Sequence, residues 1–123
     1  MGFNVLLVAI GGALGSVLRY LTSLFVAHYF SGKFPLATFI INFTGCFLIG
    51  VFLHFSLRAD EKLKYLFVIG FCGGFTTFST FANENLQLFQ NGNYILALGY
   101  TLASVVLGIL AVWLGMVAMR AYL

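Results

Sequence analysis

Charged residues are scarce in this sequence. Only 7% of its 123 residues are Asp, Glu, Lys or Arg, whereas soluble domains carry roughly 25%. Hydrophobic residues make up 62%. The six basic and three acidic residues are spread along the chain, so they form no basic patch that would bind nucleic acid. The composition therefore excludes the soluble classes and indicates an integral membrane protein.

Proline and cysteine are also rare. The single proline, Pro35, stands at the start of an apolar run, where it can begin a helix without losing a hydrogen bond. Cys46 and Cys72 lie inside apolar runs, and their spacing fits neither a disulfide framework nor a metal site. The sequence offers no nucleophile–base pair and no phosphate-binding loop, so we predict that the protein is not an enzyme.

Four apolar stretches organise the chain. A membrane-spanning helix needs about 20 apolar residues, and the four candidates cover approximately residues 3–30, 36–57, 65–89 and 94–122. The first run is much longer than the core of a signal peptide, so we interpret it as a retained span. We predict an all-α membrane protein with a single four-helix transmembrane domain over residues 1–123.

An even number of spans places both termini on the same side of the membrane. The basic residues expected on that side are Arg58, Lys62, Lys64 and Arg120. Lys33 lies on the other side, and Arg19 in the second half of the first span extends toward it. This bias of about four against two favours cytoplasmic termini. The bias is shallow, and insertion in both orientations stays open.

The first span carries the small-residue spacing Gly11-x-x-x-Gly15. Small residues four positions apart let two membrane helices approach closely. The pattern favours packing within one subunit, and the alternative is a contact between two subunits. Both interpretations stay open.

The third span contains the stretch Gly70–Phe81, which reads GFCGGFTTFSTF. Adjacent glycines at 73 and 74 weaken a helix by about 1 kcal/mol each, and the hydroxyl side chains that follow compete for backbone hydrogen bonds. We therefore predict a third helix that is broken in mid-membrane. Unwound backbone at that depth is tolerated only inside protein or beside a wet cavity, so we expect a pathway next to the break.

Asn42 is a polar residue inside the apolar second span, and Thr38 lies one turn before it on the same face. A buried amide costs several kcal/mol unless it is hydrogen-bonded. One interpretation is a hydrogen bond between helices. The other is a donor that faces a permeant anion.

Two aromatic and two hydroxyl side chains are further candidates for a pathway. Phe78 and Phe81 share a helix face, which usually indicates core packing. The edge of a phenyl ring carries partial positive charge, however, and can attract an anion. Tyr100 and Ser104 share a face of the fourth span, where their hydroxyls either form a ladder of donors or bond backbone carbonyls one turn back.

Charged residues inside spans are functional candidates by default. Glu84 is the only carboxylate within a span, and we interpret it as part of a vestibule or as a structural group. Arg19 is either an interfacial anchor or a charge that attracts anions to an entrance. His28 and His54 lie near span ends and are interpreted as interfacial side chains.

These motifs resemble those of the Fluc (CrcB) family of small bacterial fluoride channels, over nearly the whole chain. The resemblance rests on Gly11-Gly12-x-x-Gly15-x-x-x-Arg19-Tyr20, on Asn42-x-x-Gly45 and on the stretch 70–81. The last string is the most specific of the three. Ahead of the asparagine, where the family often has Gly-Thr-Leu, this chain has Ala37-Thr38-Phe39, which keeps the threonine.

The resemblance implies a fluoride-selective channel for passive export across the bacterial inner membrane, and hence fluoride resistance. It implies an antiparallel, dual-topology homodimer with two pores. The pathway residues that the resemblance implies are Asn42, Phe78, Phe81, Tyr100 and Ser104. To these we add, from their positions in the sequence, Thr38 in the pathway and Arg19 and Glu84 as candidates for an entrance or vestibule. The carbonyl groups of Gly73 and Thr76 from both subunits would hold a structural sodium ion on the dimer axis, because hard cations prefer oxygen ligands.

Two other functions remain open on the sequence. One is a proton-coupled exporter of the small multidrug-resistance type, which has four helices and needs a membrane carboxylate. Only Glu84 could supply that carboxylate here. The other is a membrane assembly subunit that transports nothing and uses its glycines only for packing.

Overall fold

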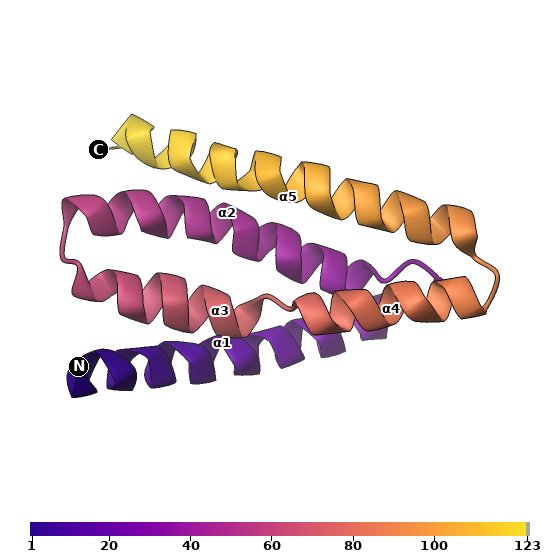
Figure 1. Ribbon diagram of the computed structural model, residues 1–123, viewed down its shortest axis with the longest axis horizontal. Helices are drawn as coiled ribbons and strands as arrows, with labels where there is room; N and C mark the ends of the chain where they lie inside the picture. Colours follow the sequence, from indigo (N-terminus) through magenta and orange to yellow (C-terminus); the bar gives the residue numbers. More distant parts are fainter. Residues whose placement is uncertain (123) are drawn as a thin grey trace.

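The computed structural model describes residues 1–122, and they form an all-helical protein with four spans (Figure 1). Three spans are single helices: α1 (Gly2–Tyr29), α2 (Leu36–Arg58) and α5 (Tyr94–Tyr122). The third span consists of η1 (Lys64–Cys72), α3 (Gly73–Phe75) and α4 (Phe78–Gln90). All four are long and apolar enough to cross a membrane. The predicted class, an all-α multi-pass membrane protein, is confirmed.

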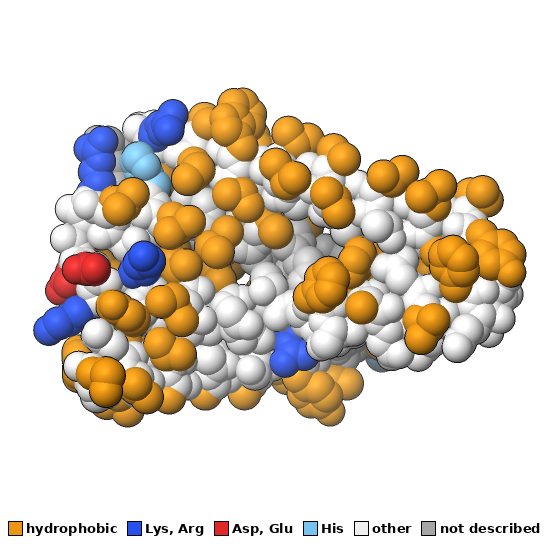
Figure 2. Space-filling model, viewed as in Figure 1, with side chains coloured by type: hydrophobic (Ala, Val, Ile, Leu, Met, Phe, Trp, Pro, Cys, Tyr) orange, Lys and Arg blue, Asp and Glu red, His pale blue; other side chains and the backbone are white. Residues whose placement is uncertain are grey.

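Consecutive spans run in opposite directions, and both termini lie at one end of the molecule (Figure 1). α2 packs along α5, and α1 packs along η1 and α3. Most of the lysine, arginine, aspartate and glutamate side chains visible in Figure 2 gather at the end where the termini lie. Large apolar side chains cover much of the remaining surface. Such a surface suits contact with lipid tails.

Glycine residues bring α1 into close contact with the third span. A Cβ atom at Gly11 would clash with Leu66 O and lie 2.8 Å from Phe71 N. A Cβ atom at Gly15 would clash with Phe71 O. The obstructing atoms belong to the backbone and cannot move aside. The small-residue spacing of the first span therefore serves packing within the subunit, which was one of the two interpretations of the sequence.

The first half of the third span is a nine-residue π-helix, η1. A π-helix forms i→i+5 hydrogen bonds and is rare beyond single-turn bulges, which often occur at functional sites. The sequence did not predict it, because most positions of this stretch are apolar and the pattern shows no period. Gly70 near its end approaches α1 closely, since its Cβ would lie 2.9 Å from Val8 O and 3.1 Å from Gly11 Cα.

The helical hydrogen-bond pattern stops after Phe75 and resumes at Phe78. Between them, Thr76 (φ −81°, ψ 159°) and Thr77 (φ −150°, ψ 118°) are extended. The two glycines are themselves helical, so the extended residues lie after them and not at them. Hydroxyl groups stabilise this geometry, since Thr76 Oγ1 donates to Cys72 O at 2.8 Å and Thr77 Oγ1 caps α4 by accepting from Thr80 N at 3.3 Å.

Gly74 has a packing role instead. A Cβ atom there would lie 2.6 Å from Gly12 O on α1. Gly73 faces open space, because no atom beyond its chain neighbours and its own helix backbone lies within 4 Å of its hypothetical Cβ. The two adjacent glycines thus face different surroundings, one a packed helix and the other a hollow.

Candidate functional site

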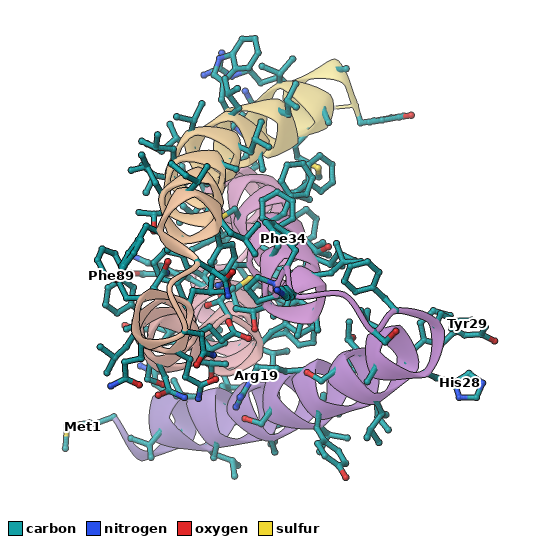
Figure 3. The ribbon with its side chains drawn as sticks, turned by 90° about the vertical axis from the view of Figure 1, so that its right-hand side faces the viewer. Met1, Arg19, His28, Tyr29, Phe34 and Phe89 are labelled. Atoms are coloured by element: carbon teal, nitrogen blue, oxygen red, sulfur yellow. The ribbon has the colours of Figure 1, made fainter. Side chains whose placement is uncertain are left out.

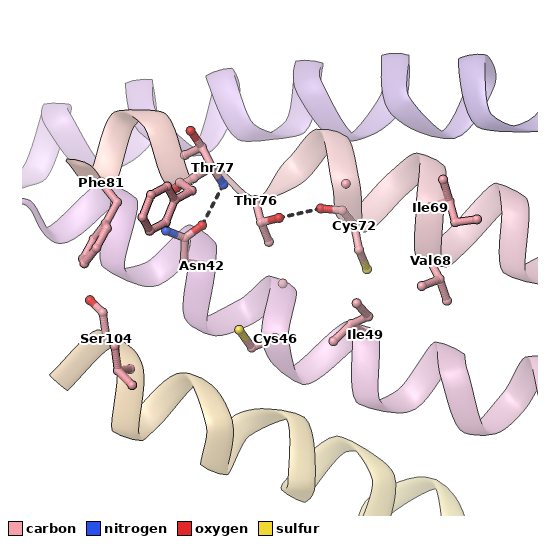
Figure 4. Close-up of a pocket in the computed structure, with 14 residues that line it drawn as sticks. Asn42, Cys46, Ile49, Val68, Ile69, Cys72, Thr76, Thr77, Phe81 and Ser104 are labelled. Atoms are coloured by element: carbon pink, nitrogen blue, oxygen red, sulfur yellow. Dashed lines mark hydrogen bonds between the residues drawn. The ribbon is translucent and has the colours of Figure 1, made fainter. Parts of the chain in front are cut away.

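A cavity of about 440 Å³ lies beside the two extended threonines, between α2, the third span and α5 (Figure 4). Most of its wall is apolar, with side chains such as Ile49, Val68 and Val105. Its polar lining comes from Asn42, Thr76, Thr77 and Ser104, and it also includes the thiols of Cys46 and Cys72. None of its lining residues is charged. The cavity can therefore present dipoles to an ion, but no full charge.

The side-chain amide of Asn42 forms hydrogen bonds with both the N–H and the carbonyl group of Thr77. Its Oδ1 accepts from Thr77 N at 2.9 Å (Figure 4). Its Nδ2 donates to Thr77 O at 3.0 Å. Asparagine carries two N–H donors on its amide, and within residues 1–122 the second makes no hydrogen bond. Asn42 therefore forms the hydrogen bond between helices that the sequence allowed, and it keeps one donor for another partner.

The same geometry leaves two backbone carbonyls without their helical donors. In a continuous helix Thr77 N would donate to Gly73 O, but here it donates to Asn42. Thr80 N would likewise donate to Thr76 O, but it donates to the Thr77 hydroxyl. Gly73 and Thr76 both line the cavity. Oxygen atoms of this kind fit a hard cation.

Phe78 and Phe81 lie on the first turn of α4, with ring centroids 5.7 Å apart. Phe78 is 78% exposed in the single chain, whereas Phe81 is half-buried and its ring lies 5.0 Å from that of Tyr100. Both phenylalanines line the cavity. Their proximity agrees with the shared face inferred from their spacing.

Glu84 joins two of the other candidates. Its Oε2 accepts from Thr38 Oγ1 at 2.9 Å, and its Oε1 accepts from Tyr100 OH at 3.0 Å. Thr38 and Tyr100 are both buried, so three helices meet at this carboxylate. Glu84 also lines a second cavity of about 530 Å³. Other polar residues of that cavity are Lys33, Gln87, Asn91 and Asn93.

Arg19 rises from α1 toward the neighbouring helices (Figure 3), and its Nε donates to Gly74 O at 3.1 Å. A cation at this position complements the carbonyl groups that point out of the end of α3. The described contact therefore places Arg19 beside the extended threonines. His28 points away from the bundle next to Tyr29 (Figure 3). His54 Nε2 is buried and has no hydrogen-bond partner among the described residues.

Two polar residues that the sequence analysis did not single out also connect helices. Thr101 Oγ1 on α5 donates to Asn85 Oδ1 on α4 at 3.0 Å, and Asn85 Nδ2 donates to Phe81 O at 3.0 Å. They follow directly after Glu84 and Tyr100, which form the neighbouring hydrogen bond. Both pairs are separated by 16 positions in the sequence. Two adjacent polar pairs with the same separation are the sequence signal that could have identified Asn85 and Thr101.

Comparison with known proteins gives one consistent result. The family described as "CrcB-like protein, Camphor Resistance (CrcB)" matches residues 6–116. The chain is 47% identical to the "Fluoride-specific ion channel FluC" of Azobacteroides pseudotrichonymphae, over 91% of this chain and 92% of that protein. It is 45% identical to the protein of the same name from Flavobacterium psychrophilum, over 93% and 94%.

A more distant relative gives the same result. The "Fluoride-specific ion channel FluC" of Rhizobium leguminosarum bv. trifolii is 44% identical, over 96% of this chain and 97% of that protein. Each alignment covers nearly the full length of both partners. The four apolar spans, the cavity beside the extended threonines and these similarities lead to one assignment: the chain belongs to the CrcB family.

Proposed function

We propose that this protein is a fluoride channel, not an enzyme, and that it permits passive export of fluoride across the bacterial inner membrane and so confers fluoride resistance. The observation that carries the proposal is a sequence identity of 44–47% to proteins named fluoride-specific ion channels, over more than nine-tenths of the chain in the relatives compared above. The uncharged, dipole-lined cavity supports it.

The proposed route begins in the cavity beside Asn42 and passes Phe78 and Phe81. It continues along Ser104, Tyr100 and Thr38 toward the cavity at Glu84. Amide and hydroxyl donors and the edges of phenyl rings can replace the water around a small anion. A channel must bind its ion weakly enough to release it, and donors without a full charge satisfy that condition better than a lysine or arginine would.

The second cavity forms the proposed entrance. It contains Lys33, and it is lined by Glu84 together with the amides of Gln87, Asn91 and Asn93. A basic residue at such a mouth raises the local concentration of anions. Thr38 and Tyr100 donate hydrogen bonds to Glu84, so its carboxyl group is held in place at the inner wall. Arg19 supplies a second positive charge, near the extended threonines.

We further propose that the functional unit is an antiparallel homodimer with dual topology and two pores. The exposed ring of Phe78 and the open space around Gly73 leave this side of the cavity available to a second copy. The modest charge bias between the two sides of the membrane permits both insertion orientations. Accessibility of terminal tags from both sides of the membrane tests this proposal, and access from only one side in every copy would refute it.

The third span would be interrupted at mid-membrane depth by Thr76 and Thr77. At the dimer axis, the carbonyl groups of Gly73 and Thr76 from both subunits would hold a structural sodium ion. The loss of their helical donors makes these oxygens suitable ligands. The ion would fix the two interruptions against each other. Thermal unfolding of the purified protein should shift to lower temperature when sodium is replaced by N-methylglucamine, and an unchanged midpoint would argue against the site.

The central experiment is an efflux assay with purified protein in liposomes, in which ion-selective electrodes follow fluoride and chloride separately. We expect fluoride to leave rapidly and chloride to remain. Protein-free liposomes provide the control. Vesicles that contain folded protein yet hold their fluoride would overturn the proposal, and would favour an assembly subunit that transports nothing.

A further inference from the structure

The position of α4 is not set by the helix that precedes it. Two extended residues, Thr76 and Thr77, separate α4 from α3, so no continuous helical hydrogen-bond pattern fixes their relative rotation. α4 must therefore be located by its own contacts with the rest of the bundle. Among the described residues, the side-chain hydrogen bonds that join this part of the span to α2 and α5 fall at two places.

The first place is the N-terminal end of α4. Asn42 on α2 holds the backbone of Thr77 with two hydrogen bonds, of 2.9 and 3.0 Å. Both bonds end on one residue. A contact at a single residue fixes a position, but it leaves the helix free to pivot about that point.

The second place lies two turns further along α4. Glu84 and Asn85 are adjacent there, and they pair with the adjacent residues Tyr100 and Thr101 of α5. Both hydrogen bonds measure 3.0 Å. Two adjacent bonds between the same two helices restrict sliding and rotation together, which a single bond does not.

Asn85 adds a connection toward the aromatic residues. Its Oδ1 accepts from Thr101, while its Nδ2 donates to Phe81 O at 3.0 Å. One amide therefore links α5 to the backbone of Phe81. Phe78 and Phe81 both lie between the Asn42 contact and this second contact.

We propose that the Asn85–Thr101 pair is a positioning element that sets where the rings of Phe78 and Phe81 stand in the ion pathway. This inference rests on the proposed function. Neither Asn85 nor Thr101 lines the cavity that contains the two rings, so the pair acts through the placement of α4. Without it, the hydrogen bonds of Glu84 still hold α4, but the bond that ties α5 to the residue bonded to Phe81 O is lost, and the two rings are placed less firmly against the opposite wall.

The test compares Thr101→Val with Thr101→Ser in the efflux assay. Valine has nearly the shape of threonine but cannot donate to Asn85, whereas serine keeps the hydroxyl group. We expect Thr101→Val to lower the ratio of fluoride to chloride permeability by about 3- to 10-fold, the range of a hydrogen bond between membrane helices. Thr101→Ser should keep the wild-type ratio.

Asn85→Leu should lower the ratio by a similar factor, and the double variant should be no worse than the more affected single variant, because both changes remove the same bond. Asn83→Leu is the matched control, since Asn83 is an exposed amide on α4 with no side-chain hydrogen bond among the described residues. The permeability ratio is the decisive measurement, because a smaller number of folded channels lowers both fluxes equally. If Asn85→Leu does not fold, the comparison of Thr101→Val with Thr101→Ser still tests the inference.

Equal ratios in Thr101→Val and Thr101→Ser would overturn the inference, as would additive losses in the double variant. The wild-type protein in the same experiment separates this failure from that of the proposed function. Wild-type vesicles that retain fluoride refute the channel itself. Wild-type efflux together with an unaffected Thr101→Val refutes only the positioning role.

Discussion

Asn42 occupies both hydrogen-bonding groups of the Thr77 backbone, accepting from its N–H at 2.9 Å and donating to its carbonyl at 3.0 Å. A side-chain amide thus takes the place of the neighbouring helical turn that Thr77 lacks. The extended backbone at Thr77 is therefore stabilised by Asn42, and the polar amide of Asn42 is in turn hydrogen-bonded by that backbone. Without the amide, both backbone groups would be left unpaired at a point that is partly buried.

Asn42→Asp should sharply reduce fluoride efflux while leaving the oligomeric state intact. The aspartate can accept from Thr77 N, but it cannot donate to Thr77 O, and it places a negative charge in the wall of the pathway. An unpaired acceptor alone costs about 1–3 kcal/mol, so we expect efflux to fall by roughly 10-fold or more. Efflux from liposomes measures the effect, and gel filtration verifies the assembly. Wild-type flux in this variant would remove Asn42 from the pathway.

Phe81→Ile should also reduce fluoride efflux strongly. Isoleucine keeps an apolar side chain at this position but removes the ring edge. It also removes the contact with the Tyr100 ring, whose centroid lies 5.0 Å from that of Phe81. Aromatic pairs contribute about 0.5–1.5 kcal/mol beyond their buried area, which corresponds to about a 3- to 10-fold loss. The matched control is Phe89→Ile on the same helix, because Phe89 is 56% exposed and lines neither of the two proposed pathway cavities. Equal flux in the two variants would contradict a specific role for Phe81.

The class of the fold could be predicted from the sequence because apolar length alone identifies membrane spans. The number of spans followed from the same signal. The π-helix η1 could not be predicted, since an apolar run without a period does not distinguish i→i+4 from i→i+5 bonding. The sequence did not show that the two glycines stay helical and that the extended residues follow them. Gly74 is a packing surface for α1, and hydroxyl groups and Asn42 support the extended backbone two residues later.

The sequence singles out individual polar residues, but it does not show which of them contact one another. Glu84 was identified because a carboxylate within a span is unusual. The sequence could not predict that Thr38 and Tyr100 both donate to Glu84. These residues are 46 and 16 positions away from it in the sequence, and the contacts depend on how their helices pack together. Asn85 and Thr101 were missed since each, viewed singly, is an ordinary polar residue near the end of a span.

Gly15→Ala should destabilise the folded subunit. The added methyl group would clash with Phe71 O and lie 2.8 Å from Phe75 N, and backbone atoms cannot relax as a flexible side chain can. Overpacking costs about 1–3 kcal/mol in general, so the midpoint of thermal unfolding in detergent should fall clearly. Gly99→Ala is the control, because no atom beyond its chain neighbours and its own helix backbone lies within 4 Å of a Cβ there. A midpoint unchanged in Gly15→Ala would show that α1 does not pack as described.

Glu84→Gln distinguishes a passive channel from a proton-coupled exporter. Glutamine keeps the size of the side chain, and the hydroxyl groups of Thr38 and Tyr100 can rotate to donate to its oxygen or accept from its amide. A passive channel should therefore retain fluoride efflux within about 3-fold, which corresponds to one hydrogen bond between membrane helices. An exporter that uses this carboxylate to carry protons should lose transport altogether.

The matched measurement is wild-type efflux with and without an imposed proton gradient at equal internal pH. We expect equal initial rates, since a channel couples fluoride to no other ion. Transport that follows the gradient in the wild type and disappears in Glu84→Gln would establish the exporter instead.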